Sequence, residues 1–366
     1  MTASIGAGAE LTSEGVDLEK VAEGFYSPRD LTYIRPQKRW LTEYEAVICN
    51  TQPDLGQFEV GGWLAVRADG SGIHNPESTA LSHPNWFEYR DPSAMWQRPY
   101  VKQLAQFERS IASAMSAAKA NGALGDIAPD WLDLLAHHYE AFGSFEWGMF
   151  RAHAIVAREA LADTLTMASI FSGHDRLRHQ QDIALYSLNL HNQLASYEEG
   201  LGLATWLDDP VCQPARRLVE RLMSLTDWCE IILMTNFVIE PLYTTLVGSE
   251  FFRRLAPLHG DIVTAVIEMT TETARARNRR MAQELMNLVS AESDRVGRSV
   301  PNERNREIVQ GWANTWYPDA MAAAEAFLPL FDSASVSADF KRQALARVIA
   351  DTREIFDTAG LKVPPG

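Results

Sequence analysis

Histidine and glutamate three residues apart on a helix can bind one metal ion, because the spacing i, i+3 places both side chains on one face. A carboxylate-bridged diiron centre in a helical bundle needs two such Glu-x-x-His pairs and a lone glutamate on each of two further helices. None of the nine histidines has a glutamate three residues before it. The residues at those positions are Ser71, Ala80, Leu134, Leu135, Phe150, Phe171, Arg176, Leu188 and Ala256. We therefore expect that the chain cannot build this metal centre in its usual form.

Other catalytic motifs are missing from the sequence as well. It contains no GxGxxG or GxxxxGK[ST] phosphate-binding loop, no GxSxG nucleophile motif and no HExxH zinc motif. Adjacent His137 and His138 do not share a helix face, which favours partly exposed helix histidines over a metal site. The three cysteines, Cys49, Cys212 and Cys229, lie far apart without a CxxC pair. This pattern indicates reduced thiols in a cytosolic protein.

Bulk properties limit the class of protein that presents these residues. The chain has 366 residues, of which 46% are hydrophobic, so it can bury a sizeable core, and its length alone suggests about two domains. Its net charge is 33 − 48 = −15, which argues against a nucleic-acid-binding surface. The N-terminus does not read as a signal peptide, and no apolar run reaches the roughly 18 residues of a membrane span. We expect a soluble, cytoplasmic protein that binds neither nucleic acid nor membrane.

The chain divides into two regions near residue 98. Residues 1–98 are rich in proline, glycine and tryptophan and show weak helical periodicity apart from Leu41–Asn50. They are predicted to form a long, mostly irregular arm that packs on partner subunits, in which Phe58–Val66 is a short strand or simply extended. Residues 99–366 are predicted to form an all-α body, because their long segments indicate a helical bundle. The expected helices are 99–121, 129–161, 163–195, 213–247, 250–256, 259–291, 301–330 and 335–359, with Ser337 as the N-cap of the last.

Three segments carry a resemblance to a known family. They are Trp86–Val101 (Trp-Phe-Glu-Tyr-Arg-Asp-Pro-Ser-Ala-Met-Trp-Gln-Arg-Pro-Tyr-Val), Asn236–Tyr243 (Asn-Phe-Val-Ile-Glu-Pro-Leu-Tyr) and the arm around Arg29–Tyr33. Over roughly residues 25–350 the chain resembles the β subunits of bacterial soluble diiron monooxygenase hydroxylases, which act on methane, toluene, phenol, propane and alkenes. The propane, acetone or phenol type is favoured over the methane type, and propane 2-monooxygenase is the preferred type among them. The resemblance implies a ferritin-like (ribonucleotide-reductase-like) helical bundle.

The resemblance also implies a site, because the catalytic α subunits of this family share the fold. Their ligands are Glu on one helix, Asp-Glu-x-Arg-His on the next, Glu on a third and Asp-Glu-x-Arg-His on a fourth. Asp175–His179 (Asp-Arg-Leu-Arg-His) resembles the first motif, with Arg176 in place of the ligand glutamate and His179 kept. Glu146 lies thirty residues before Arg176. Either Glu146 or Glu140 corresponds to the first lone glutamate.

The second half of the pattern departs in the same way. Glu240 corresponds to the lone glutamate of the third helix, and Thr271–Arg275 to the last motif, with Glu272 kept and Arg275 in place of histidine. The implied pseudo-site, metal-free and without catalytic residues, consists of Glu146 (or Glu140), Arg176, His179, Glu240, Glu272 and Arg275. Arginine can replace the lost metal charge, because it stays protonated and binds carboxylates through two donors. Alternatively, several of these residues are ordinary surface charges that align by chance.

The resemblance implies a non-catalytic scaffold subunit of an NADH-dependent monooxygenase. The expected partners are a catalytic α subunit that holds the diiron centre, a second copy of this chain across a two-fold axis in an α₂β₂ assembly, a coupling protein, and a reductase with FAD and a [2Fe–2S] cluster. The reaction would insert one oxygen atom from O₂ into a small hydrocarbon or aromatic. Two other interpretations remain: an independent ferritin-like metalloprotein with unusual ligands, and a helical binding protein without an oxygenase partner.

Overall fold

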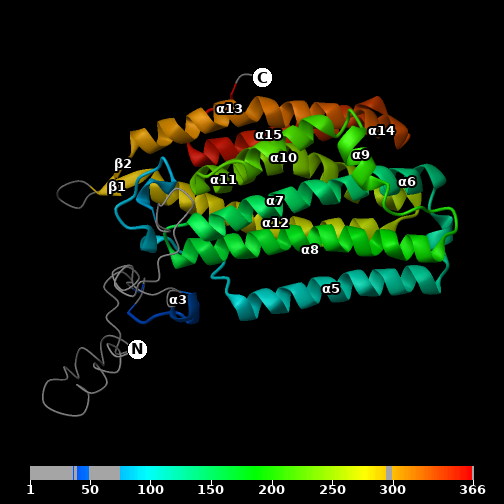
Figure 1. Ribbon diagram of the computed structural model, residues 1–366, viewed down its shortest axis with the longest axis horizontal. Coiled ribbons are helices and arrows are strands. Elements are labelled where there is room, and N and C mark those ends of the chain that lie inside the picture. The colour runs from blue at the N-terminus through cyan, green and yellow to red at the C-terminus, as the bar shows by residue number, and fades with distance from the viewer. Residues whose placement is uncertain (1–35, 37–38, 49–74, 294–298, 365–366) are drawn as a thin grey trace, which may run out of the picture.

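The computed structural model describes residues 36, 39–48, 75–293 and 299–364, and long helices dominate them. Figure 1 shows these helices running side by side in a bundle. The longer elements are α5 (Gln97–Ala120), α7 (Glu140–Glu159), α8 (Asp163–Gln193), α10 (Gln213–Met223), the π-helix η5 (Thr235–Arg253), α12 (Ile262–Val289), α13 (Glu303–Phe327) and α15 (Ala338–Ala359). The predicted all-α class is confirmed.

Short elements connect the long ones. They are α3 (Glu43–Ile48), η1 (Pro76–Ser78), η2 (Trp86–Glu88), η3 (Ala123–Asp126), α6 (Pro129–Leu134), the π-helical turn η4 (Leu135–Tyr139), α9 (Gly202–Asp208), α11 (Trp228–Met234), η6 (Ala256–His259) and α14 (Pro329–Ser333). A two-stranded antiparallel hairpin, β1 (Ala291–Ser293) and β2 (Ser299–Pro301), precedes α13. The sequence analysis predicted neither α9 nor this hairpin.

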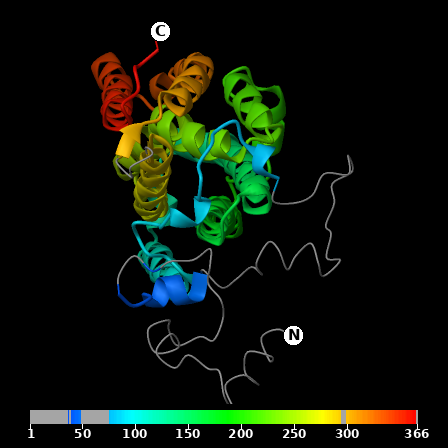
Figure 2. The ribbon, with the colours of Figure 1, turned by 90° about the vertical axis from the view of Figure 1, so that its left-hand side faces the viewer.

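The bundle has α7, α8, η5 and α12 at its centre. α7 packs along α8, α12 contacts α5, α8 and η5, and η5 also contacts α13 and α15. Figure 2, turned by 90°, shows α3 and α5 at one side of the bundle and α13 and α15 at the other. Four central elements therefore point side chains toward one another, and outer helices cover them.

Side chains that accept hydrogen bonds from the first turn set several helix starts. Asp227 accepts from the Glu230 amide at 3.1 Å, Asp261 from the Thr264 amide at 3.0 Å, and Ser337 from the Phe340 amide at 3.1 Å. The predicted cap at Ser337 is confirmed. The single helix predicted at 213–247 is wrong, because α10 ends at Met223 and the chain restarts at the Asp227 cap.

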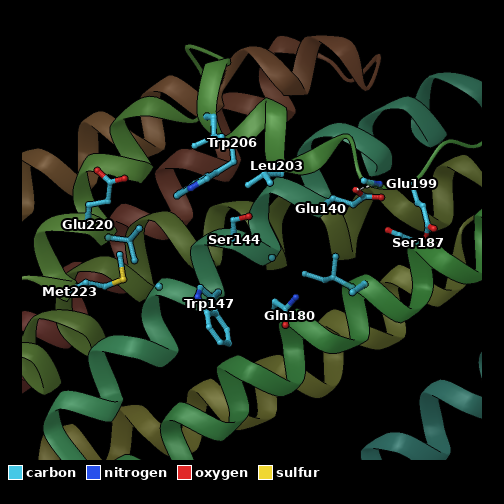
Figure 3. Close-up of a pocket in the computed structure, with 17 residues that line it drawn as sticks. Glu140, Ser144, Trp147, Gln180, Ser187, Glu199, Leu203, Trp206, Glu220 and Met223 are labelled. Carbon is cyan, nitrogen blue, oxygen red and sulfur yellow. Dashed lines mark hydrogen bonds between the residues drawn. The ribbon is translucent and has the colours of Figure 1, made fainter.

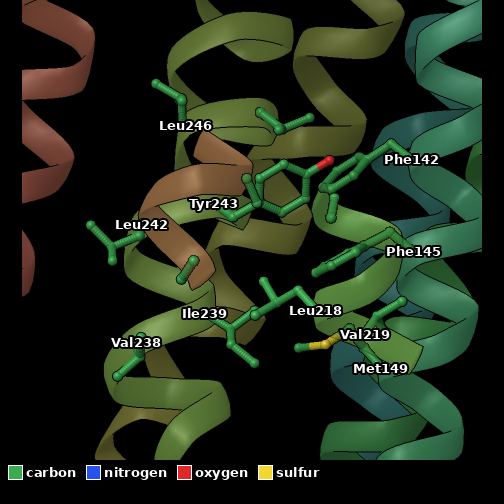
Figure 4. Packing of buried hydrophobic residues seen from close by; sticks show 14 of the residues in the cluster. Phe142, Phe145, Met149, Leu218, Val219, Val238, Ile239, Leu242, Tyr243 and Leu246 are labelled. Atoms are coloured by element: carbon green, nitrogen blue, oxygen red, sulfur yellow. The ribbon is translucent and has the colours of Figure 1, made fainter. Parts of the chain in front are cut away.

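The π-helix η5 is the most buried long element. Its aromatic and aliphatic side chains interlock with α7 and α10, as Figure 4 shows for Tyr243, Phe145 and Leu218. The rings of Phe145 and Tyr243 pack edge to face at a centroid distance of 4.8 Å. Trp228–His259 is long and apolar enough to cross a membrane, contrary to the expectation that no segment is, but its most apolar window is 94% buried inside the bundle. It is therefore a core helix.

The described end of the predicted arm packs on its own chain. The Ala80 amide donates to Asp227 at 2.6 Å, the Ser82 amide donates to Asn305 at 3.1 Å, and the Tyr89 hydroxyl donates to the Met281 carbonyl at 3.2 Å. Residues 75–98 therefore belong with the helical body. The described part of the earlier arm, which includes α3, also packs on this chain, because Nε of Arg90 lies 3.0 Å from Oε1 of Glu45. Residues 1–35 and 49–74, including Trp63 and the segment Phe58–Val66, lie outside the described residues, and their packing on partner subunits stays a prediction.

Candidate functional site

Six charged side chains from four central elements meet inside the bundle. They are Glu146 on α7, Arg176 and His179 on α8, Glu240 on η5, and Glu268 and Arg275 on α12. None of these side chains is more than 4% exposed. We call this group the charge cluster. Such a group is stable in a low-dielectric interior only where opposite charges and hydrogen bonds compensate one another.

Arg176 joins two of the carboxylates. Its Nη2 lies 2.8 Å from Oε2 of Glu240, and its Nη1 lies 3.3 Å from Oε2 of Glu146. Burial opposes the charged guanidinium, but Glu240 and Glu146 outweigh burial and raise the pKa of Arg176. Arg176 therefore stays protonated and connects α7, α8 and η5.

Arg275 is the second cation and contacts all three carboxylates. Its guanidinium nitrogens lie 3.5 Å from the nearest oxygens of Glu146, Glu240 and Glu268. These distances are longer than those of good hydrogen bonds, so the contacts are mainly charge–charge attraction. Arg275 therefore neutralises the centre of the charge cluster without holding any single carboxylate tightly.

His179 lies between two carboxylates, one facing each ring nitrogen. Its Nε2 is 2.7 Å from Oε1 of Glu268, and its Nδ1 is 3.3 Å from Oε1 of Glu146. Burial alone would lower the pKa of His179, but Glu268 and Glu146 raise it. A neutral imidazole has a single N–H and would turn a lone pair toward one of these carboxylates. The geometry therefore fits a doubly protonated imidazolium.

Glu146 and Glu268 are correspondingly ionised. Burial would raise the pKa of Glu146, but Arg176, His179 and Arg275 lower it to about 2. Burial also opposes ionisation of Glu268, and His179 and Arg275 again lower its pKa. Glu268 further accepts a hydrogen bond from the Tyr139 hydroxyl at 3.0 Å.

Five of the six residues inferred for the pseudo-site lie in the charge cluster, and Glu272 does not. The Glu272 side chain is 43% exposed and pairs with Arg253 at 3.0 Å. Glu268 occupies the position in the charge cluster that was expected for Glu272. Glu268 and Arg275 are seven residues apart and so lie within about 20° of each other around α12, whereas Glu272 lies about 60° from Arg275. The i, i+7 spacing on α12 was the available signal for Glu268.

The choice between Glu146 and Glu140 is clear from their contacts. The carboxylate of Glu140 accepts hydrogen bonds from the amides of Gly200 at 2.8 Å and Gly202 at 3.2 Å, at the start of α9. Glu140 therefore fixes a loop at the surface, and Glu146 is the α7 member of the charge cluster.

A buried neutral histidine lies beside the charge cluster and was not predicted. His153 on α7 has its Nδ1 3.2 Å from the Ser169 hydroxyl. Burial and the nearby Arg176 lower the pKa of His153 to about 3. The two buried histidines therefore have opposite protonation states, because two carboxylates contact His179, whereas burial and Arg176 outweigh the influence of Glu146 on the pKa of His153.

The charge cluster does not fit a diiron centre. Its carboxylates are separated by guanidinium groups rather than by open space, and only one histidine contacts them. Over the residues that the structure describes, no group of three or more His, Cys, Asp or Glu side chains is arranged to hold a metal ion. Two irons would require the guanidiniums of Arg176 and Arg275 to leave.

The family is identified by the part of the sequence that forms the charge cluster. Residues 63–293, which include every element of the charge cluster, match the methane/phenol/alkene hydroxylase family. The chain belongs to this family. It is 27% identical to the small subunit of the propane 2-monooxygenase hydroxylase component of Rhodococcus jostii (strain RHA1) over 354 residues, 96% of this chain and 95% of the relative. It is also 27% identical to the β chain of methane monooxygenase component A of Methylosinus trichosporium, over 87% of this chain and 82% of that one.

The fold agrees with a solved structure of this family. Xenon-pressurised phenol hydroxylase from Pseudomonas sp. OX1 superimposes with a TM-score of 0.72 at 20% identity, covering 88% of this chain and 91% of that chain. The expected ferritin-like fold and the expected resemblance to small, or β, hydroxylase subunits are confirmed.

Proposed function

We propose that this chain is the non-catalytic small subunit of the hydroxylase in a soluble diiron monooxygenase. The observation that carries the proposal is the position of Arg176 between Glu146 and Glu240, where a metal-binding relative of this fold would need open ligands. The chain contributes a rigid helical body, and a larger catalytic subunit holds the iron.

Charge balance explains how the fold stays stable without iron. The charge cluster contains three carboxylates, two guanidiniums and one imidazolium, so its charge is −3 + 2 + 1 = 0. Guanidinium groups suit this role because they remain charged when buried and present several donors to carboxylates. The charge cluster is therefore a permanent structural replacement for bound metal.

The proposed assembly contains two copies of this chain and two catalytic subunits. A reductase with FAD and a [2Fe–2S] cluster supplies electrons from NADH, and a coupling protein regulates turnover. The similarity to propane 2-monooxygenase small subunits supports a small hydrocarbon as substrate. Residues 1–35 and 49–74 would extend across a partner subunit. We place the protein in the cytoplasm, where the NADH that the proposed reductase would oxidise is found.

Co-expression with the large subunit encoded by a neighbouring gene tests this proposal. We expect the pair to co-purify, and the chain alone to be poorly soluble or self-associated, because obligate interfaces are large and apolar. Metal analysis should find iron in the complex and none in the separated small subunit. Stoichiometric iron in the isolated chain that disappears in the His179→Ala variant would show an independent metalloprotein instead. A soluble monomer that does not associate with the large subunit would favour a helical binding protein.

A further inference from the structure

A groove on the surface of the bundle lies apart from the charge cluster. It has a volume of about 740 Å³ and is lined by α7, α8, α9 and α10. Figure 3 shows Ser144 and Trp147 of α7 and Leu203 of α9 around its middle, with Glu220 toward one end and Glu199 toward the other. None of its lining residues belongs to the charge cluster.

The groove exposes large apolar side chains at one place. Leu203 is 62% exposed, Trp147 is 45% exposed and Leu207 is 43% exposed, and all three line the groove. Single exposed apolar residues are ordinary, but a group of them around a concave surface indicates a binding partner. Burying such side chains in an interface releases water and stabilises the complex.

The shape of the groove fits a helix. The α7 residues that line it run from Glu140 to Gly148, and the α8 residues run from Gln180 to Ser187. At 1.5 Å per residue, these walls are about 10–12 Å long, which equals about two helical turns. An amphipathic helix that places apolar side chains at i and i+4 could cover Trp147 and Leu203 together.

The charges at the groove favour a basic partner. Glu199 has no ion-pair partner among the described residues, and Glu220 pairs with Arg216 at 2.7 Å. Glu140 is already used by backbone amides. A second copy of this chain carries a net charge of −15, so it would meet an acidic groove with like charge. A lysine or arginine near Glu199 would instead give an attractive contact.

We propose that this groove binds an amphipathic helix of the large catalytic subunit, with two apolar side chains over Trp147 and Leu203 and a basic side chain beside Glu199. The proposal rests on the proposed function, since that function supplies the large subunit as the partner. It adds the surface through which the two chains recognise each other.

Two matched pairs of variants in the co-expressed complex test the proposal. Glu199→Lys is compared with Glu198→Lys, because both carboxylates are exposed neighbours and only Glu199 lines the groove. Leu203→Glu is compared with Leu185→Glu, which alters a 57% exposed leucine outside the groove. We expect each groove variant to weaken association with the tagged large subunit about tenfold relative to its control, as loss of a central interface contact does. The Glu199→Lys effect should shrink as salt rises.

A photo-cross-linking residue at Leu207 identifies the occupant directly. We expect mass spectrometry to find the cross-link on a helix of the large subunit with a basic residue at one end, and a charge reversal of that residue to restore binding of Glu199→Lys. Cross-links to a second copy of this chain or to the coupling protein, or groove variants that match their controls, would overturn the inference. Failure of the unaltered chain to co-purify with the large subunit would instead contradict the proposed function.

Discussion

The Nε2 of His179 lies 2.7 Å from Oε1 of Glu268, joining α8 to α12 by a hydrogen bond inside the protein. The other ring nitrogen faces Glu146 on α7, and the Phe142 ring packs edge to face against the imidazole at 5.6 Å. The imidazole is therefore enclosed by two carboxylates and an aromatic ring. Its proton completes the charge balance of three carboxylates and two guanidiniums.

The charge on His179 predicts a loss of stability at high pH. Its folded pKa is raised above the ordinary value of 6.5. The stabilisation is therefore fully present below about pH 6.5 and disappears as the pH rises through the raised pKa. We expect His179→Gln to lower the free energy of unfolding and to flatten its pH dependence above pH 6.5. Urea unfolding of the purified complex at several pH values measures both effects.

His174→Gln is the control for His179→Gln, because His174 lies on the same helix with its side chain exposed. Its unfolding curve should follow that of the unaltered protein at every pH. If His179→Gln kept the full alkaline loss of stability, the imidazolium would not be its source.

His153 predicts the opposite pH dependence. Its pKa is lowered to about 3 by burial and by Arg176, so the neutral ring is favoured in the folded protein. Stability from this group is present above about pH 6.5 and falls as the pH drops toward 3. The variant His153→Gln should lose part of the acid sensitivity between these values. An unchanged acid limb in thermal unfolding would argue against a buried neutral His153.

Arg176 is predicted to be essential to folding or assembly. Its replacement by methionine keeps an unbranched apolar stem but removes the guanidinium, which leaves Glu146 and Glu240 without their shared cation. We expect a loss of roughly 3–5 kcal/mol in the free energy of unfolding, the cost of breaking a buried ion pair from one side. Glu240→Gln in the same chain should recover part of this loss, since it removes an unpaired charge. Denaturant unfolding of the two single variants and the double variant measures the coupling.

Glu272→Gln is the matched control on the neighbouring helix. Because Glu272 is partly exposed and pairs with Arg253 at the surface, we expect a change within about 0.5 kcal/mol. A large loss of stability in Glu272→Gln, together with a small loss in Arg176→Met, would support the place of Glu272 in the buried cluster that was inferred from sequence.

The members of the charge cluster that could be predicted from sequence are those whose common face follows from their spacing along one helix. Arg176 and His179 lie three residues apart on α8, so their shared face needed only helical geometry. Glu268 was missed because Glu272 and Glu268 are one turn apart on α12. Which of them faces inward depends on the rotation of α12 against η5, and that rotation comes from packing across the whole bundle.

Helix boundaries show the same division between local and long-range causes. The cap at Ser337 is a local hydrogen bond, and the sequence was enough to predict it. The break before Asp227 also had a local signal, because Asp227 is an N-cap residue. Apolar residues on both sides of the break favoured the prediction of one continuous helix. The attachment of residues 75–98 depends on partners such as Asn305, which lies 223 residues from Ser82 in the chain. Sequence periodicity carries no information about such a distant contact.

Replacement of Gly248 on η5 by alanine is predicted to destabilise the protein, because the added methyl group would overlap the charge cluster. A Cβ at this residue would lie 2.4 Å from Oε2 of Glu268 and 2.8 Å from Nη1 of Arg275. Both atoms belong to buried groups that are held by other charges, so neither can move away freely. We expect Gly248→Ala to cost about 1–3 kcal/mol in the free energy of unfolding, as overpacking does. Gly311→Ala on α13 is the control, because a Cβ there meets no atom within 4 Å, and it should stabilise by about 0.5–1 kcal/mol by favouring the helix. Thermal unfolding of both variants in the complex measures the difference in stability. If Gly248→Ala were as stable as Gly311→Ala, η5 and α12 would not approach each other as closely as the contacts of the charge cluster require.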